Sequence, residues 1–123
     1  MMIEELDYNR DKFADIVAKD NRFDARAYAL LVRVLDILGG EEHDRHFSGE
    51  DILEEFKEEA LDQFGPLTYT VLTEWGLRQT EDIGEMMFNL VDSNRIGRDE
   101  NDGSESFVDG YDFKETFSDP YQT

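Results

Sequence analysis

Apolar residues recur every three or four positions along most of the chain, and polar residues fill the positions between them. This spacing is typical of helices that bury one face and leave the other in solvent. The pattern predicts helices over residues 3–19, 25–38, from Ser48 to the Gly65-Pro66 break, 66–75 and 80–93. The predicted fold class is mainly α, as one compact domain of four to five helices.

The segment 25–38 has the clearest pattern, because its apolar residues follow two helical stripes instead of one. One stripe comprises Tyr28, Leu31, Leu35 and Leu38, and the other comprises Leu30, Val34 and Ile37. A helix that is apolar on two faces usually lies at the centre of its domain. Gly39-Gly40 is expected to end this helix, since glycine adopts the left-handed conformation without a steric penalty.

Capping residues precede three of the predicted helices. Asp24 and Thr80 are predicted N-caps, and Ser48 is predicted to form a capping box with Asp51. The later helices carry apolar stripes that should face the core and acidic residues that should face solvent. The inward residues are Ile52, Leu53, Phe56, Ala60 and Leu61, then Leu67, Val71, Leu72 and Trp75, then Ile83, Met86, Met87, Leu90 and Val91. The outward acids of the third helix are Glu54, Glu55, Glu58 and Glu59.

The C-terminal region is less regular than the helices before it. Residues 95–98 and 106–109 are candidate strands of a small hairpin, which makes α+β with a winged-helix-like order the alternative fold. The aromatic residues expected to dock this region on the body are Phe107, Tyr111, Phe113 and Phe117. Along the whole chain, the predicted single domain, 1–123, consists of an N-terminal helix (1–20), a core (21–118) and a frayed tail (119–123).

Composition adds an extreme surface charge to this picture. The chain has 31 acidic and 12 basic residues and a net charge of −19, spread over both halves. Binding to phosphates requires Lys and Arg, so direct nucleic-acid binding is disfavoured and a protein is the expected partner. Two interpretations of the charge stay open: an ordinary acidic surface, or halophilic adaptation to concentrated salt. Cysteine is absent, no signal peptide or membrane span is apparent, and a cytoplasmic location is expected.

No established catalytic, cofactor-binding or metal-binding motif is present, so we expect no cofactor and no enzyme activity. His43 and His46 lack a third ligand at a metal-site spacing. The run 99–103 resembles a calcium loop, but its register would put Arg98 at the first ligand position. The minority alternative is a carboxylate-based hydrolase using Glu74 or Glu85, which would need one acid removed from water.

A longer pattern resembles a family of small bacterial proteins of unknown function. The strings that carry it are Gln63–Leu67 (QFGPL), Glu74–Gly76 (EWG), Thr80–Val91 (TEDIGEMMFNLV) and Gly110–Phe113 (GYDF). The resemblance covers about residues 20–118. It implies a relative and supplies no activity, substrate or cofactor.

The leading functional hypothesis is therefore a non-enzymatic module that binds another protein or regulates one. The candidate partner-binding residues are Trp75, Arg78, Glu85, Tyr111 and Phe113. Aromatic side chains that lie exposed beside glycine-containing turns anchor many interfaces. The alternative is that all three rings belong to the core. A nucleic-acid-linked regulator, either a winged-helix relative or an acidic mimic of DNA, is the second hypothesis.

Overall fold

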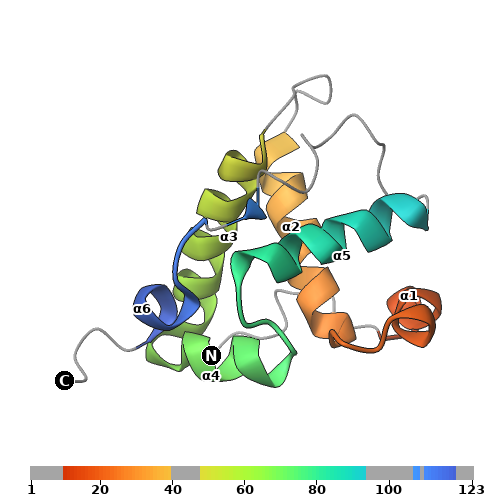
Figure 1. The fold of residues 1–123 in the computed structure, drawn as a ribbon, viewed down its shortest axis with the longest axis horizontal. Helices are drawn as coiled ribbons and strands as arrows, with labels where there is room; N and C mark the ends of the chain where they lie inside the picture. The colour runs from red at the N-terminus through yellow and green to blue at the C-terminus, as the bar shows by residue number, and fades with distance from the viewer. Residues whose placement is uncertain (1–9, 40–47, 94–106, 109, 119–123) are drawn as a thin grey trace.

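The computed structural model describes residues 10–39, 48–93, 107–108 and 110–118, and this part of the chain is almost entirely helical (Figure 1). Its elements are the 3₁₀ helix η2 (Arg10–Phe13), α1 (Ala14–Lys19), α2 (Ala25–Gly39), α3 (Gly49–Phe64), the 3₁₀ helix η3 (Gly65–Leu67), α4 (Thr68–Glu74), α5 (Thr80–Asp92) and α6 (Phe113–Phe117). No strand occurs among these residues. The protein is therefore mainly α, as the apolar spacing predicts.

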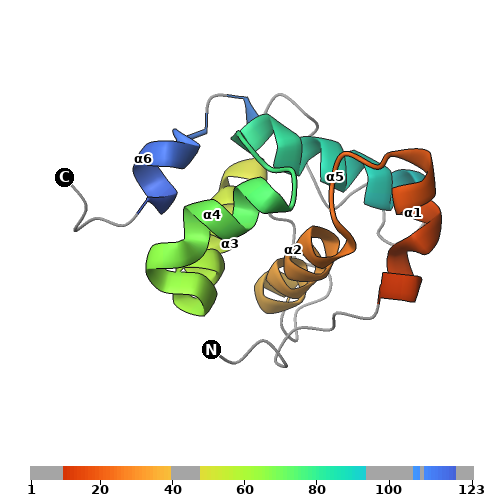
Figure 2. The ribbon, with the colours of Figure 1, turned by 90° about the horizontal axis from the view of Figure 1, so that it is seen from below.

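The helices form one compact domain around a central pair, α2 and α3, which make the most extensive contact among the described elements. Helix α5 begins beside α3 and runs across α2, and α1 lies on the side of α2 away from α3 (Figure 1). In Figure 2, which is seen from below, α4 lies in front of α3, and α6 packs against both of these helices. This arrangement confirms the central position predicted for the helix with two apolar stripes.

The main helix boundaries follow from capping residues. Ser48 and Asp51 form the predicted capping box, with 3.1 Å between each side-chain oxygen and the other residue's backbone nitrogen. Gly65 ends α3 with φ of 53°, a conformation that favours glycine. Asp24 accepts at Oδ1 from the backbone N–H of Arg26 at 2.9 Å, as expected of an N-cap.

The predicted N-cap of α5 is wrong by one residue. Gln79 is the N-cap, and Asp82 Oδ2 accepts from the backbone N–H groups of Arg78 and Gln79. Thr80 is buried instead, and its hydroxyl donates to the carbonyl of Phe107 at 2.6 Å and accepts from the N–H of Gly110 at 3.0 Å. The threonine side chain therefore holds the C-terminal segment against α5.

The second candidate strand, 106–109, is not a strand at the two positions that the structure describes, and these hydrogen bonds give the reason. Phe107 and Val108 lie in a helical turn, since Thr80 binds the backbone that a strand would pair. The first candidate strand, 95–98, lies outside the described residues. The short helix α6 was not predicted from periodicity. Asp112 is its N-cap and accepts from the backbone N–H of Glu115 at 2.9 Å.

Most of the predicted core is confirmed. Buried side chains include Phe23, Tyr28, Leu30, Leu31, Val34, Ile52, Phe56, Leu72, Ile83, Met86, Met87, Leu90, Phe107, Phe113 and Phe117. Two predicted core residues are exposed: Leu67 lies in the 3₁₀ turn before α4, and Ile37 lies in the last turn of α2, where no residue is buried. Leu61 and Val71 are only partly buried at the rim of the core.

Two further sequence predictions need correction. The predicted helix 3–19 is α-helical only over Ala14–Lys19; residues 10–13 form a 3₁₀ turn, and 3–9 lie outside the described part. Glu59 was expected on the outward face of α3 but is 8% exposed. Its buried carboxylate is compensated by Arg33 on α2, which donates from Nε to its Oε1 at 2.7 Å. No helix of the described residues combines the length and apolar character needed to cross a bilayer.

Candidate functional site

The three aromatic residues among the predicted partner-binding set lie in or against the core. Trp75 is 5% exposed and Phe113 is 3% exposed. The ring of Phe64 meets Trp75 edge-on at 5.4 Å, and the guanidinium of Arg26 lies 5.6 Å from the Trp75 ring centre. Trp75 and Phe113 therefore stabilise the fold and present little surface to a partner.

Tyr111 is half-buried and also serves the fold. Its ring stacks on Phe113 at 6.1 Å and meets Phe117 edge-on at 5.6 Å. Its hydroxyl donates to the carbonyl of Leu53 at 3.0 Å, and burial raises the pKa of this phenol well above its ordinary value. These contacts attach the α6 segment to α3.

The two charged members of the predicted set, Arg78 and Glu85, lie at the surface. Arg78 precedes α5, and Glu85 lies near its middle. The five predicted residues therefore do not converge on one site. Only Arg78 and Glu85 are placed where another molecule can reach their side chains.

The outward side of α5 carries an aromatic residue that is not among the predicted partner-binding residues. Phe88 is 63% exposed, although it lies between the buried Met87 and the partly buried Asn89. Along α5, the residues Glu81, Glu85, Phe88 and Asp92 follow one another at spacings of four, three and four positions. All four therefore share one helical face. We call these four residues the α5 outer face. This spacing is readable in the sequence, where Phe88 falls outside the apolar stripe of its helix.

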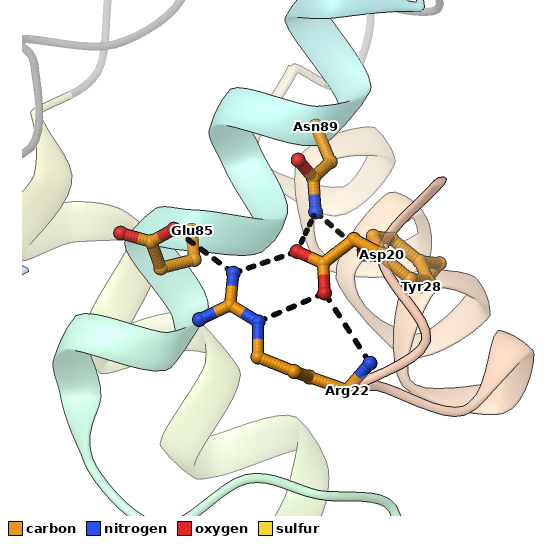
Figure 3. Close-up of polar contacts among 5 residues, drawn as sticks. All are labelled: Asp20, Arg22, Tyr28, Glu85 and Asn89. Atoms are coloured by element: carbon orange, nitrogen blue, oxygen red, sulfur yellow. Dashed lines mark hydrogen bonds and ion pairs between the residues drawn. The ribbon is translucent and has the colours of Figure 1, made fainter. Parts of the chain in front are cut away.

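A network of polar side chains borders this face and ties the α1–α2 loop to α5 (Figure 3). Arg22 donates from Nε to Asp20 Oδ1 at 2.8 Å and from a terminal nitrogen to Asp20 Oδ2 at 2.6 Å. The same terminal nitrogen donates to Glu85 Oε1 at 3.1 Å. The bidentate bond from Arg22 holds the pKa of Asp20 below its ordinary value, and the two carboxylates raise the pKa of Arg22.

Asn89 completes the network from the next turn of α5. Its side-chain nitrogen donates to Asp20 Oδ2 at 3.1 Å and to the hydroxyl of Tyr28 at 2.9 Å. Tyr28 is fully buried, and burial raises the pKa of its phenol. Figure 3 shows Glu85 and Asn89 reaching down from one helix to the loop that carries Asp20 and Arg22. The network is therefore a structural link whose exposed end is the Arg22–Glu85 pair.

A second ion pair lies at the other end of the α5 outer face. Lys19 Nζ lies 3.5 Å from Asp92 Oδ2, and both side chains are at least half exposed. Arg22 and Glu85 are likewise half exposed. Pairs of this kind contribute roughly 0–1 kcal/mol each, because water competes for both partners. The carboxylates of Glu85 and Asp92 are therefore held only weakly by their partners.

A shallow, open groove of about 590 Å³ lies between α1, the following loop and the end of α4. Its lining includes Ala14, Val17 and Ala18 of α1, Arg22 of the loop and Glu74 at the end of α4. Glu74 and Glu85 both face solvent. Neither carboxylate is removed from water, as a carboxylate-based active site requires, so the geometry does not favour the hydrolase alternative.

The described residues contain no group of three His, Asp or Glu side chains arranged to hold a metal ion. His43, His46 and the calcium-like run 99–103 lie outside the described residues, so the expectation of no metal site stays a prediction. Comparison of the chain with protein-family models, with curated proteins and with solved structures finds no match. The resemblance to a bacterial family likewise stays a prediction.

Proposed function

We propose that this protein is a non-enzymatic interaction module that binds another protein through the α5 outer face. The observation that carries the proposal is the position of Phe88, whose large apolar ring is 63% exposed at the middle of a well-packed helix. Burial of a phenylalanine side chain contributes roughly 1.5–3 kcal/mol. A partner that covers Phe88 gains most of that contribution, which is how aromatic residues anchor interfaces.

The rest of α5 supports this assignment, because the helix is held rigidly from beneath. Ile83, Met86, Met87 and Leu90 are buried on its inner side. The Thr80 hydroxyl and the Asn89 hydrogen bonds to Asp20 and Tyr28 fix its position against the neighbouring segments. A rigid helix face loses little conformational entropy on binding, which favours affinity.

The charge of α5 argues against the nucleic-acid hypothesis in its direct form. The helix contains four acidic residues and no Lys, Arg or His, and the whole chain has a net charge of −19. A winged-helix protein contacts phosphates through basic residues, so this face would repel DNA. An acidic mimic of DNA would bind a basic protein by charge alone and would not depend on Phe88.

Site-specific photo-crosslinking tests the proposal. A photoreactive phenylalanine analogue is placed at position 88 and, as a matched control, at the exposed position of Glu58 on α3. In lysate of the source cells, position 88 should give a discrete adduct with another protein, and position 58 should not. Excess unlabelled wild-type protein should suppress the adduct, whereas the Phe88→Ser variant should not.

The proposal fails if position 88 yields no discrete adduct, or if Phe88→Ser competes as well as the wild type. In the second case the partner contacts the protein without using the Phe88 ring, as an acidic mimic would.

A further inference from the structure

We infer that the partner of the α5 outer face is a basic protein segment that places an apolar side chain on Phe88 and Lys or Arg side chains beside Glu81, Glu85 and Asp92. This inference rests on the proposed function and names the chemistry of the partner. Its basis is the combination of one exposed aromatic ring with carboxylates on both sides along a single helix.

The spacing of the face sets the size of the segment that fits it. Glu81 and Asp92 are separated by 11 positions, and an α-helix rises about 1.5 Å per residue, so the carboxylates span roughly 16 Å. Phe88 lies between them. An amphipathic helix of about three turns would cover this length with its apolar stripe over Phe88 and its flanking basic residues near the acids.

Two of these carboxylates, Glu85 and Asp92, can turn to such a partner with little loss of internal structure. If Glu85 leaves Arg22, the guanidinium keeps its two hydrogen bonds to Asp20, at 2.8 and 2.6 Å. Asp92 gives up only its exposed contact with Lys19 at 3.5 Å. Since exposed pairs are worth roughly 0–1 kcal/mol, a partner with several basic groups can replace them.

Charge also decides between a basic segment and a second copy of this chain. In a two-fold symmetric dimer, the α5 outer face would meet itself, and three acidic residues would oppose three acidic residues. Each copy would also have a net charge of −19. Nucleic acids and anionic membranes are opposed by the same repulsion, whereas a basic segment is attracted toward the face.

The chain provides an internal control for this argument. On α3, the exposed residues Glu54, Glu58 and Asp62 form an acidic stripe with spacings of four. The exposed face there has no aromatic residue. A partner attracted by charge alone would be affected equally by changes at either stripe, whereas the inferred partner depends on α5.

The probe for the test is a fluorescent amphipathic helical peptide composed of lysine and leucine, about three turns long. Binding is followed by anisotropy, and the contacted residues are mapped by amide chemical shifts. The α5 variant is Glu81→Gln/Glu85→Gln/Asp92→Asn, and its control is Glu54→Gln/Glu58→Gln/Asp62→Asn. Each removes the same charge, and thermal melting checks that both are folded.

We expect the α5 variant to weaken peptide binding by about tenfold or more, and the α3 variant by about twofold at most, since only the α5 acids lie beside the bound segment. Phe88→Ser should also weaken binding by about tenfold, and this loss should persist at high salt, where charge contacts are screened. The amide chemical shifts that change when the peptide binds should belong mainly to residues of α5. A peptide with serine in place of leucine should bind weakly to every variant.

Equal losses for the α5 and α3 variants, or no effect of Phe88→Ser, would overturn the inference. Such a result would leave the proposed function standing if crosslinking at position 88 still captures a partner, which would then lack the basic segment. Absence of any adduct at position 88 is the separate result that removes the proposed function.

Discussion

Arg33 on α2 donates from Nε to Oε1 of Glu59 on α3 at 2.7 Å, across the contact between the two central helices. The carboxylate of Glu59 is buried, while Arg33 extends to the surface. The pair thus places one charged group inside the domain and supplies its counter-charge from the neighbouring helix. Removal of one partner from such a pair costs more than the pair itself contributes, because a buried charge loses its compensation.

Replacement of Arg33 by methionine should therefore lower the free energy of unfolding by about 1–3 kcal/mol, measured by urea denaturation. The matched control is Lys57→Met, which breaks the surface pair between Lys57 and Glu54 at 3.1 Å on the same helix. This control should cost at most about 0.5 kcal/mol. Similar losses for the two variants would show that burial of Glu59 does not depend on Arg33.

The Asn89 side chain should contribute more to stability than the hydroxyl of Tyr28 that it binds. Tyr28→Phe removes one hydrogen bond, at 2.9 Å, and should cost about 0.5–1.5 kcal/mol. Asn89→Ala removes the bonds to both Tyr28 and Asp20 and leaves a buried hydroxyl without its donor, so it should cost about 1–3 kcal/mol. The double variant should cost less than the sum of the single ones. Simple additivity in unfolding experiments would mean that the two groups do not interact.

Asp20 should make the fold sensitive to acid. Arg22 holds the pKa of Asp20 below its ordinary value in the folded protein. A lowered folded pKa stabilises the protein above the unfolded pKa, which is about 3.9, and this contribution is lost as the pH falls toward the folded pKa. Asp20→Asn should therefore destabilise the protein most at about pH 6, and the loss should begin to shrink below about pH 4, where the Asp20 carboxyl of the unfolded chain becomes protonated. A difference in unfolding free energy that stays constant over this range would contradict the assignment.

Sequence periodicity was sufficient to predict α2, α3 and α5, because each of these helices buries a continuous apolar stripe against the core. The signals that begin and end them are local as well. Ser48 with Asp51 and the glycine at position 65 act within a few residues of their own helix. Short elements could not be predicted in this way, since η2 and α6 have too few residues to establish a period.

The candidate site was only partly predictable, because its contacts join distant parts of the chain. Glu85 was selected from the sequence, but its partner Arg22 lies 63 positions away, and Asp20 lies 69 positions from Asn89. Trp75 looked accessible beside a glycine turn, yet the packing of Phe64 and Arg26 covers it. The exposure of Phe88, in contrast, can be predicted from the sequence, because this residue lies outside the apolar stripe of its helix.

Gly76 should be the glycine least tolerant of substitution among those in the described residues. It has φ of 99°, and a Cβ there would lie 2.0 Å from the carbonyl oxygen of Arg22. Gly76→Ala should therefore cost about 2–4 kcal/mol and displace the loop that carries Arg22. Gly39 is the matched control, since a Cβ there meets nothing within 4 Å. Gly39→Ala should leave the melting temperature unchanged or raise it slightly, and equal effects of the two substitutions would be inconsistent with this packing.

The surface charge should make stability depend on salt. At −19, the folded chain repels itself, and screening shortens that repulsion from a range of about 10 Å at 0.1 M salt to about 3 Å at 1 M. We expect the melting temperature to rise with KCl, measured by circular dichroism. The Glu54→Gln/Glu58→Gln/Asp62→Asn variant removes three of the 31 acids and should show a smaller rise. A melting temperature of the wild type that does not change with KCl would show that repulsion among the carboxylates does not limit stability. This result would exclude adaptation to concentrated salt and leave the ordinary acidic surface as the interpretation.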